Sequence, residues 1–479
     1  MWRYLVVQGL AVLGLIFLTA PALPQAEPNP SDVEAFLDEA MPAASAPGLA
    51  WAIIEAGEIR SGVRGELVAG SGRRVTEDTP FPLGSISKSF TALAIMQQVE
   101  AGQVELDRPI SAYLDAFEGQ PGAAITIRQL LSHTSGYSTL QGNQSHADQP
   151  GQVGSLADGA RQLAMITPAG EAGVYWQYSN ANYLILGALI ETVSGLGFGD
   201  YIETRILDPL GMDDSFVGGS DRGVGEAVAI GHTPWFGGRR PVAASDDPMA
   251  RAMAPAGGIV GSAVDVTRYL AMMMNGEDDL ISADHKAMML QPASAASPFY
   301  GFGWFLDAGA DTAYHTGLVP GVATVAVLSR SEQRGGVALV NANSGMGFGV
   351  TGDILAGLSA YALGNTPASG GSHLGAQSFY LMLAGTPLLF LAGIVMVWIR
   401  RAGLRAKSGP VGLFSLWFPL VSTLAMAWAF LDLTPRLFGT PLMTLSLYQP
   451  DMVVLLIASS VIGVSFAVFR LGVAYTGRS

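Results

Sequence analysis

The chain of 479 residues contains no cysteine. This absence excludes a disulfide, a thiolate metal site and a cysteine nucleophile. Lysine is also scarce, because Lys88, Lys286 and Lys407 are the three lysines in the chain and arginine supplies the other basic side chains. Arginine stays protonated in proteins, whereas a lysine can act as a base when its pKa is lowered. A lysine close to a serine in this chain is therefore informative.

Charged residues are few as well, at 13 % of the chain, and the net charge of −14 comes without a basic patch. We therefore expect no nucleic-acid partner. The six histidines do not cluster, and the pattern His-Glu-x-x-His does not occur, so we expect neither a metal nor another cofactor. The pattern Gly-x-Ser-x-Gly is also missing, which disfavours the usual α/β-hydrolase arrangement of Ser, His and Asp.

Apolar residues are in excess, since 49 % of the chain is hydrophobic and the mean hydropathy is +0.36. This composition predicts membrane segments. Residues 1–26 are typical of a secretory signal, because Arg3 precedes an apolar core from Leu5 to Ala20 and small residues offer a cleavage site after Ala22 or Ala26. An uncleaved anchor helix is the alternative interpretation. With either interpretation, we expect the domain after residue 26 to be exported.

Three apolar stretches, at about 378–399, 411–431 and 452–469, are each close to the ~20 residues that cross a bilayer. Four basic residues separate the first two stretches: Arg400, Arg401, Arg405 and Lys407. The positive-inside rule then places this loop and the C-terminus in the cytoplasm. We expect these parts in order: a signal at 1–26, an exported domain at 27–364, a linker at 365–377, a transmembrane region at 378–470 and a cytoplasmic tail at 471–479.

This organisation predicts a protein of a bacterial inner membrane, with its large domain in the periplasm. The apolar stretches make lipid a partner of the chain. A homo-oligomer formed through these stretches is left open. The sequence also leaves open whether they only anchor the domain or help to shape its site.

The stretch from Phe81 to Glu100 suggests a nucleophile and its base. Pro82 and Gly84 interrupt regular structure, and an apolar helical pattern comes after them. Ser85 should therefore open a helix, with Lys88 one turn further on the same face. A serine hydroxyl needs a base to take its proton, and burial could lower the pKa of a lysine enough for that task. The alternative is that Ser85 caps the helix and Lys88 is solvated.

The remaining pattern predicts one α/β domain with strands at both ends and helices between, so that its termini meet in a single sheet. The expected strands are Gly48–Glu55, Glu58–Ala69, Tyr300–Phe305, Val322–Leu328 and Gly336–Asn341. Residues 137–160 and 218–250 are polar or irregular, and we expect them to be loops that set the substrate.

Two further motifs lie beside these elements. Tyr178 precedes an apolar helix, and Asn180 is placed to cap that helix. His315, Thr316 and Gly317 come just before the strand at Val322. Taken alone, Tyr178 could be a core tyrosine and His315 a loop histidine.

The order Ser85-x-x-Lys88, Tyr178-Ser-Asn180 and His315-Thr-Gly317 resembles the serine hydrolases of the class C β-lactamase and penicillin-binding-protein type. That family includes D-alanyl-D-alanine carboxypeptidases, D-aminopeptidases and esterases. The resemblance covers roughly residues 30–365. It implies an α/β (α+β) fold of the β-lactamase/transpeptidase type, with an antiparallel sheet flanked by helices and an all-helical subdomain, here followed by three transmembrane helices.

The resemblance also implies roles for the motif residues. Ser85 would be the acylated nucleophile, and Lys88 and Tyr178 would share the acid and base work. Asn180 would bridge Lys88 and a substrate amide. His315, Thr316, Gly317 and Leu318 would bind substrate, with the backbone N–H groups of Ser85 and Leu318 forming an oxyanion hole.

Other polar residues have structural interpretations. His133 is expected to tie the turn between Leu131 and Gly136 rather than to react. Asn341 and Asn343 could line the site or simply end a strand.

The third motif departs from many penicillin-binding proteins, which have a lysine where His315 stands. A lysine offers a permanent cation to a substrate carboxylate, whereas a histidine is mostly neutral at pH 7. This departure disfavours a DD-carboxypeptidase or a dedicated β-lactamase. We therefore expect a membrane-anchored peptidase or amidase acting on peptides with D-residues.

The signal, the domain and the three apolar stretches together also resemble the inner-membrane peptidases that mature non-ribosomal peptides, such as the colibactin-activating peptidase, which remove a prodrug group. The alternatives are an esterase or β-lactamase with the same Ser-Lys-Tyr residues, and a non-catalytic sensor that binds muropeptides or β-lactams.

Overall fold

The computed structural model describes residues 30–147, 155–223, 227–242, 253–307, 311–368 and 370–476. The expected signal at 1–26 lies outside the described residues. The described chain forms two compact units. The N-terminal unit comprises the described residues of Ala22–Gly345 and Gly349–Gly370, and the C-terminal unit comprises those of Met346–Phe348 and Gly371–Ser479.

A six-stranded antiparallel sheet forms the base of the N-terminal unit, in the order β2-β1-β11-β10-β9-β8. Its strands are β1 Gly48–Glu55, β2 Glu58–Gly65, β8 Phe305–Asp307, β9 Thr312–Val319, β10 Val322–Ser329 and β11 Arg334–Val340. The first and last long strands, β1 and β11, are neighbours, so the prediction that the domain's termini meet in one sheet is confirmed.

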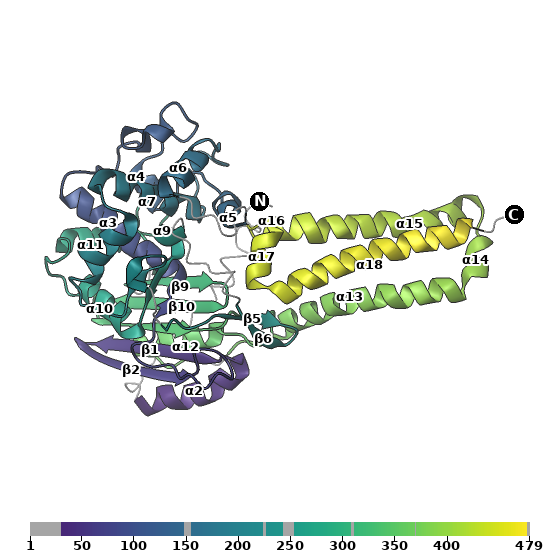
Figure 1. Ribbon diagram of the computed structural model, residues 1–479, viewed down its shortest axis with the longest axis horizontal. Helices are drawn as coiled ribbons and strands as arrows, with labels where there is room; N and C mark the ends of the chain where they lie inside the picture. The colour runs from purple at the N-terminus through teal and green to yellow at the C-terminus, as the bar shows by residue number, and fades with distance from the viewer. Residues whose placement is uncertain are drawn as a thin grey trace. The chain divides into compact units, whose positions relative to one another are not determined.

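Helices cover both faces of this sheet, as Figure 1 shows. Helices α2 (Pro30–Ala44) and α12 (Gly352–Ala362) pack on one face, and α10 (Ala263–Met274) packs on the other. The side chains of strand β1 contribute to the cores on both faces of the sheet, because successive side chains of a strand point to opposite sides. Leu49, Trp51 and Ile53 enter the core beneath α2 and α12, whereas Ala50, Ala52 and Ile54 join the larger core with α10.

A helical layer completes the N-terminal unit. Its helices are α3 Ser87–Glu100, α4 Ile127–Leu131, α5 Thr139–Ala147, α6 Leu156–Ala164, α7 Asn180–Ser194, α8 Phe198–Ile202, α9 Ala254–Gly257 and α11 Ala283–Met289. Helices α3 and α7 are buried on nearly all sides, in agreement with the apolar runs that both contain. Helix α5 and the first turn of α6 lie within 137–160, so the prediction of an irregular loop there is wrong.

Two small sheets lie outside the main one. Strands β3 (Phe81–Pro82), β7 (Ile259–Gly261) and β4 (Phe216–Val217) form the first. Strands β5 (His232–Trp235) and β6 (Gly238–Pro241) form a hairpin within the stretch expected to be irregular.

The C-terminal unit contains three helices that are long and apolar enough to cross a membrane. They are α13 Leu374–Ile399, the run Gly409–Leu437 that begins with α15 (Gly409–Trp428), and α18 Pro450–Tyr475. Helix α18 contacts both others. A Cβ atom at Gly463 would lie 2.9 Å from the ring of Phe390 and 3.0 Å from Met426, so glycine lets the three helices pack closely. The expectation of three C-terminal apolar helices is confirmed.

Candidate active site

Ser85 lies in a short 3-10 turn, η1 (Gly84–Ile86), directly before α3. The preceding residue anchors this turn to two sheets, because Leu83 N donates to Ile259 O (2.8 Å) and Leu83 O accepts from Thr324 Oγ1 (2.8 Å). Gly84 has φ +58°, and a Cβ atom there would lie 2.6 Å from the backbone N of Leu318. Glycine is therefore required for η1 to approach β9 this closely.

Lys88 occupies the first turn of α3 and is fully buried. Its Nζ donates to Ser85 Oγ at 3.0 Å and to the carbonyl oxygen of Ala256, in α9, at 2.6 Å. Burial lowers the pKa of Lys88 well below its ordinary value, because a low-dielectric environment disfavours the charged amine. The arrangement places an amine that readily loses its proton beside a serine hydroxyl.

Tyr178 lies in the loop that leads into α7, and the centre of its ring is 4.9 Å from Lys88 Nζ. Thr139 Oγ1 donates to the carbonyl oxygen of Tyr178 at 2.6 Å, and Ser179 N donates to His133 Nδ1 at 3.2 Å. The structure thus brings Ser85, Lys88 and Tyr178 together from two elements that lie far apart in the sequence.

His133 packs against the loop that carries Tyr178 and bonds to it. It is fully buried, adopts the left-handed φ of 58°, and its ring lies 4.4 Å from that of Tyr178. Burial, with the nearby Lys88 and His315, lowers the pKa of His133 well below its usual value, so the ring is neutral. Since Nδ1 accepts from Ser179 N, the proton of the neutral ring sits on Nε2. The structural role expected of His133 in the Leu131–Gly136 turn therefore includes the loop that carries Tyr178.

His315, Thr316 and Gly317 precede the strand at Val322, β10, as expected. They also lie inside a strand of their own, β9, which the sequence did not predict. Alternation along β9 buries His315 and Gly317 and exposes Thr316 and Leu318. Strand β8 pairs with Thr312–Tyr314 alone, which leaves the edge of β9 beside His315–Val319 outside that pairing. Thr316 and Leu318 therefore face solvent on the same strand that contacts η1.

The polar contacts of His315 define its tautomer. Nδ1 lies 2.7 Å from the carbonyl oxygen of Thr316, which accepts its proton, so Nε2 accepts from the Tyr300 hydroxyl at 3.2 Å. Burial, with Lys88 nearby, lowers the pKa of His315 to about 3. His315 is therefore neutral at pH 7 and does not offer a substrate the cation that a lysine would.

Asn180 is the first residue of α7, and Ser179 is the N-cap residue, without a side-chain capping bond. The prediction that Asn180 caps this helix is therefore wrong. Its Nδ2 donates to Asn143 Oδ1 in α5 at 2.9 Å. Among the described residues, the expected bridge from Asn180 to Lys88 is not formed.

Comparison with known proteins decides the family. Residues 33–360 match the family model described as Beta-lactamase. The chain belongs to the Beta-lactamase family. Its relatives include Penicillin-binding protein 4 of Amycolatopsis lactamdurans, 30% identical over 52% of this chain and 64% of that protein. Esterase EstB of Burkholderia gladioli is 34% identical over 30% of this chain and 40% of that protein.

Solved structures agree with this membership. The octameric penicillin-binding protein homologue from Pyrococcus abyssi is 25% identical, with a TM-score of 0.61 over 70% of this chain and 78% of its own. SurE is 26% identical, with a TM-score of 0.56 over 65% of this chain and 72% of its own. A class C beta-lactamase at 20% identity has a TM-score of 0.58 over 71% of this chain and 97% of its own, which shows the shared fold.

The predicted resemblance and fold class are thereby confirmed, and this Beta-lactamase family member belongs with serine hydrolases. The chain spans less than two thirds of the length of the first curated relatives that it matches.

Three contacts of this family member were not found from the sequence. Ala256 O accepts from Lys88 Nζ, the Tyr300 hydroxyl bonds to His315, and the His133 ring lies beside Tyr178. A backbone carbonyl carries no sequence signal. Asn343 has a structural role, because its Nδ2 donates to Val319 O and Val322 O (both 3.0 Å) and fixes the turn between β9 and β10. Asn341 similarly accepts from Gly48 N at 2.7 Å.

Aromatic rings continue from Tyr178 away from Lys88. Phe305 lies 6.4 Å from Tyr178, Trp176 lies 6.1 Å from Phe305, and Phe299 lies 5.0 Å from Trp176, measured between ring centres. The side chains of Tyr175, Phe299 and Leu318 are exposed. The surroundings of this candidate site are thus largely apolar.

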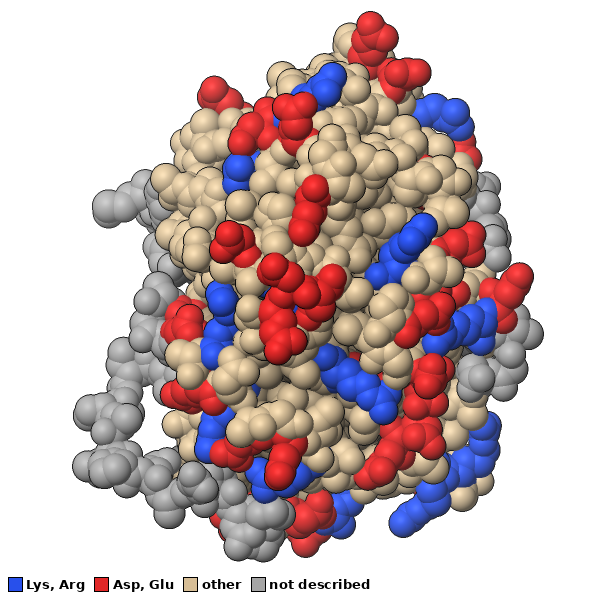
Figure 2. All heavy atoms as spheres, turned by 90° about the vertical axis from the view of Figure 1, so that its left-hand side faces the viewer, with Lys and Arg blue, Asp and Glu red and all other residues tan. Residues whose placement is uncertain are grey.

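Charged side chains of both signs lie on one face of the molecule. On the face drawn in Figure 2, basic and acidic side chains of the described residues are interspersed rather than gathered into one patch.

Proposed function

We propose that this protein is a membrane-anchored serine hydrolase in which Ser85 is the nucleophile and Lys88 and Tyr178 are the acid and base. One observation carries the proposal: the buried Lys88, whose pKa is lowered, donates to Ser85 Oγ at 3.0 Å. A neutral amine at that distance is a base within reach of the hydroxyl proton.

Acylation begins when Lys88 Nζ takes the Ser85 proton and Oγ forms a bond to the substrate carbonyl carbon. The resulting oxyanion is stabilised by the N–H groups of Ser85 and Leu318. When the C–N bond breaks, the leaving amine takes a proton from the Tyr178 hydroxyl, and the Lys88 ammonium returns one to Tyr178. Water then repeats the sequence on the acyl-serine, which releases the acid and restores Ser85.

The substrate class is inferred from the neutral His315 and the aromatic surroundings. Without a cation at His315, a free carboxylate on the substrate would be poorly bound, whereas apolar groups could contact Phe299, Phe305 and Leu318. An amide in a peptide with a D-residue fits this site, and SurE, a structural neighbour, has been solved with D-Leu. The removal of an N-acyl prodrug group from a non-ribosomal peptide is one reaction of this class.

An esterase with the same residues is the second candidate, favoured by the likeness to EstB. A β-lactamase would use the same acylation, and a non-catalytic sensor would acylate without rapid release. Rapid deacylation separates the enzymes from the sensor, and preference for D-peptide amides over esters separates the peptidase from the esterase.

The location is part of the proposal. Helices α13 and α18 and the run Gly409–Leu437 would hold the N-terminal unit at an inner membrane. The basic segment α14 (Arg401–Arg405) would lie in the cytoplasm by the positive-inside rule, which leaves the N-terminal unit in the periplasm.

The test uses full-length protein in detergent, a fluorophosphonate probe and intact-mass measurement. Wild type should gain one probe mass and Ser85→Ala none. Ser87→Ala is the matched control, since Ser87 Oγ accepts from Ile259 N in the fold and its variant should still be labelled. Equal labelling of wild type and Ser85→Ala would refute the assignment. Wild type is then given N-acyl-D-amino amides, the matching esters and a chromogenic β-lactam.

A further inference from the structure

The hairpin β5–β6 ends in an apolar tip. Phe236 and Gly237 form its turn with φ of 47° and 83°, the left-handed pair that a type I′ hairpin turn requires. At this tip Trp235 is 37% exposed and Phe236 is 49% exposed. Their rings lie 4.9 Å apart at a steep angle. Two adjacent exposed aromatic residues at a turn differ from the scattered apolar residues of an ordinary surface.

The base of the hairpin is firmly held. Arg239 Nη2 donates to Ala44 O at 2.8 Å and to Gly349 O at 2.5 Å, and Arg239 also donates to Asn343 O. His232 is fully buried, and its Nε2 accepts from Ala69 N at 3.2 Å. The base of the hairpin is therefore tied to several segments of the N-terminal unit, and the aromatic tip projects from this base.

A cation accompanies the aromatic pair. The guanidinium of Arg240 lies 4.4 Å from the centre of the Trp235 ring, and Arg240 is exposed. Among the residues that the structure describes, Arg240 forms no ion pair with a carboxylate. Tryptophan and phenylalanine with arginine are the side chains that lie at the boundary between lipid tails and anionic headgroups.

The short covalent connection to α13 would keep the N-terminal unit near a bilayer that α13 crosses. Helix α12 ends at Ala362 and α13 begins at Leu374, so the connection is short, and a fully extended chain spans at most about 3.5 Å per residue. If α13 crosses a membrane, the N-terminal unit stays within a few tens of ångströms of its surface.

From these observations we propose that the tip of hairpin β5–β6 inserts Trp235 and Phe236 into the headgroup region of the bilayer that holds α13, with Arg240 on anionic headgroups. The inference rests on the membrane anchoring in the proposed function and is independent of the chemistry at Ser85. Such a second contact would fix the orientation of the N-terminal unit on the membrane.

The absence of cysteine makes the test direct, because one introduced thiol is the sole site of labelling. A spin label is placed on Phe236→Cys in full-length protein, reconstituted in nanodiscs of phosphatidylcholine with or without phosphatidylglycerol. Its accessibility to oxygen, which concentrates in lipid, is compared with that to a water-soluble nickel complex. Leu389→Cys on α13 and Met165→Cys in the N-terminal unit are the references, since both side chains are more than two thirds exposed.

We expect the label at 236 to favour oxygen over nickel, as the label at 389 does, while the label at 165 favours nickel. Adding Arg240→Gln should weaken the oxygen preference at 236 most in discs with phosphatidylglycerol. Nickel access at 236 equal to that at 165 would overturn the proposal. Exclusion of both reagents at 236, as by a second protein copy, would also overturn it.

Two controls distinguish a failure of the hairpin proposal from a failure of the membrane anchoring or of the chemistry at Ser85. A label at 389 that is open to nickel would remove the membrane anchoring and the hairpin proposal with it. Fluorophosphonate labelling of Ser85 in the same discs reports the proposed chemistry separately, whatever the position of the hairpin.

Discussion

The backbone N–H of Ser179 donates to Nδ1 of His133 at 3.2 Å, and this bond joins the Leu131–Gly136 turn to the loop that carries Tyr178. Asn182 Nδ2 shares the same ring nitrogen at 2.9 Å. His133 is therefore a positioning residue for Tyr178 rather than a reacting one.

If His133 positions Tyr178, its replacement by asparagine and its replacement by glutamine should have different effects on activity. Asparagine can place an oxygen near Nδ1 and tolerates the left-handed backbone, whereas glutamine leaves Ser179 N–H buried without an acceptor, at a cost of about 1–3 kcal/mol. We expect His133→Asn to keep most of the fluorophosphonate labelling rate and His133→Gln to lose more of it, with kcat reduced rather than KM raised. Equal rates in the two variants would argue against this bond.

Lys88 is expected to be the base, and the chain offers a matched control in the other buried lysine. Lys88→Arg, which stays protonated, should lower the rate of Ser85 labelling at least about 100-fold, whereas Lys286→Met should leave the rate of folded protein unchanged. In wild type the labelling rate should rise with pH as Lys88 loses its proton and level off below the ordinary lysine pKa. A rate of Ser85 labelling that does not change with pH would contradict this role of Lys88.

The neutral His315 predicts how stability depends on pH. Its folded pKa of about 3 lies below the ordinary 6.5, so between these pH values the unfolded chain binds a proton that the folded chain does not. Stability is therefore fully present above pH 6.5 and is lost as pH falls toward 3, with a slope of up to about 1.4 kcal/mol per pH unit. His315→Gln should show a shallower fall of the unfolding temperature over this range. An unchanged pH dependence would refute the assignment.

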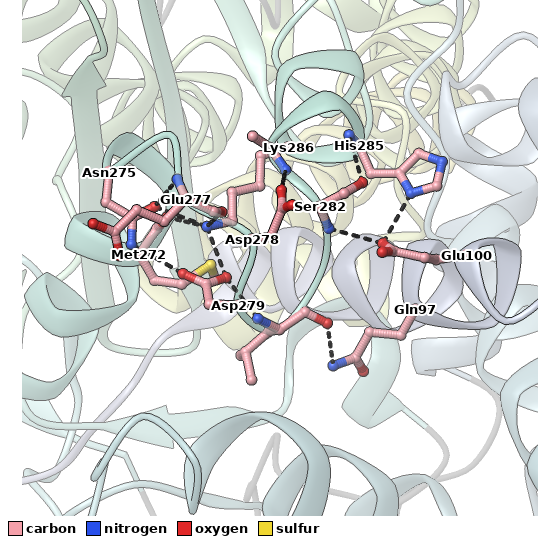
Figure 3. A network of polar contacts seen from close by, with 12 residues as sticks. Gln97, Glu100, Met272, Asn275, Glu277, Asp278, Asp279, Ser282, His285 and Lys286 are labelled. Atoms are coloured by element: carbon pink, nitrogen blue, oxygen red, sulfur yellow. Dashed lines mark hydrogen bonds and ion pairs between the residues drawn. The ribbon is translucent and has the colours of Figure 1, made fainter.

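Lys286 serves the fold, as the network in Figure 3 shows. Its buried Nζ donates to Met272 O (2.9 Å), Asn275 Oδ1 (2.8 Å) and Glu277 O (2.8 Å) and pairs with Asp279 Oδ1 (2.7 Å). Lys286→Met removes the hydrogen bond or ion pair that each of these acceptors receives from Nζ, and we expect a loss of about 3 kcal/mol. The partly exposed Asp279 makes Asp279→Asn the milder control. Thermal unfolding of both variants tests the order, and an Asp279→Asn loss as large as that of Lys286→Met would contradict it.

Gly84 predicts a loss of activity without a change of any polar side chain. A methyl group there would push η1 away from Leu318 N, so Gly84→Ala should slow Ser85 labelling about 10²-fold or more by disturbing the oxyanion hole. Gly57→Ala is the control, because Gly57 also has a positive φ but nothing within 4 Å of the added carbon. Similar labelling rates in the two variants would refute the role of Gly84.

The sequence predicted β1, β10 and β11 well because their apolar runs are long and their turns are marked by glycine. It missed β9, in which buried and exposed residues alternate around His315 and no apolar run exists. Tyr300–Phe305 was expected to be a strand, but Phe305 alone enters β8, since Tyr300 turns inward to contact His315. Tertiary contacts, rather than local preference, decide these segments.

In the candidate site too, contacts between residues that are close in the sequence could be predicted, whereas contacts between distant segments could not. Ser85 and Lys88 could be paired from the sequence because Lys88 follows Ser85 by three positions, about one helical turn further along the chain. The partners that come from distant segments could not, since Ala256 contributes a backbone oxygen and Asn180 turns to Asn143 instead of Lys88. The resemblance to the family gave the motif residues and their order, whereas the packing of the fold determines which of these residues contact one another.

The pairing of β1 with β11 also sets the order in which the chain can fold. Gly48 N bonds to Asn341 Oδ1 across 293 residues, so β1 waits for nearly the whole N-terminal unit to be synthesised before its inner neighbour exists. Closing so long a loop makes this step slow. If the chain is exported from its N-terminus, as proposed above, the sheet can close only shortly before α13 reaches the membrane. In the described part of the chain, helix α12 is the one helix between β11, the last strand that the sheet needs, and α13, which would halt translocation.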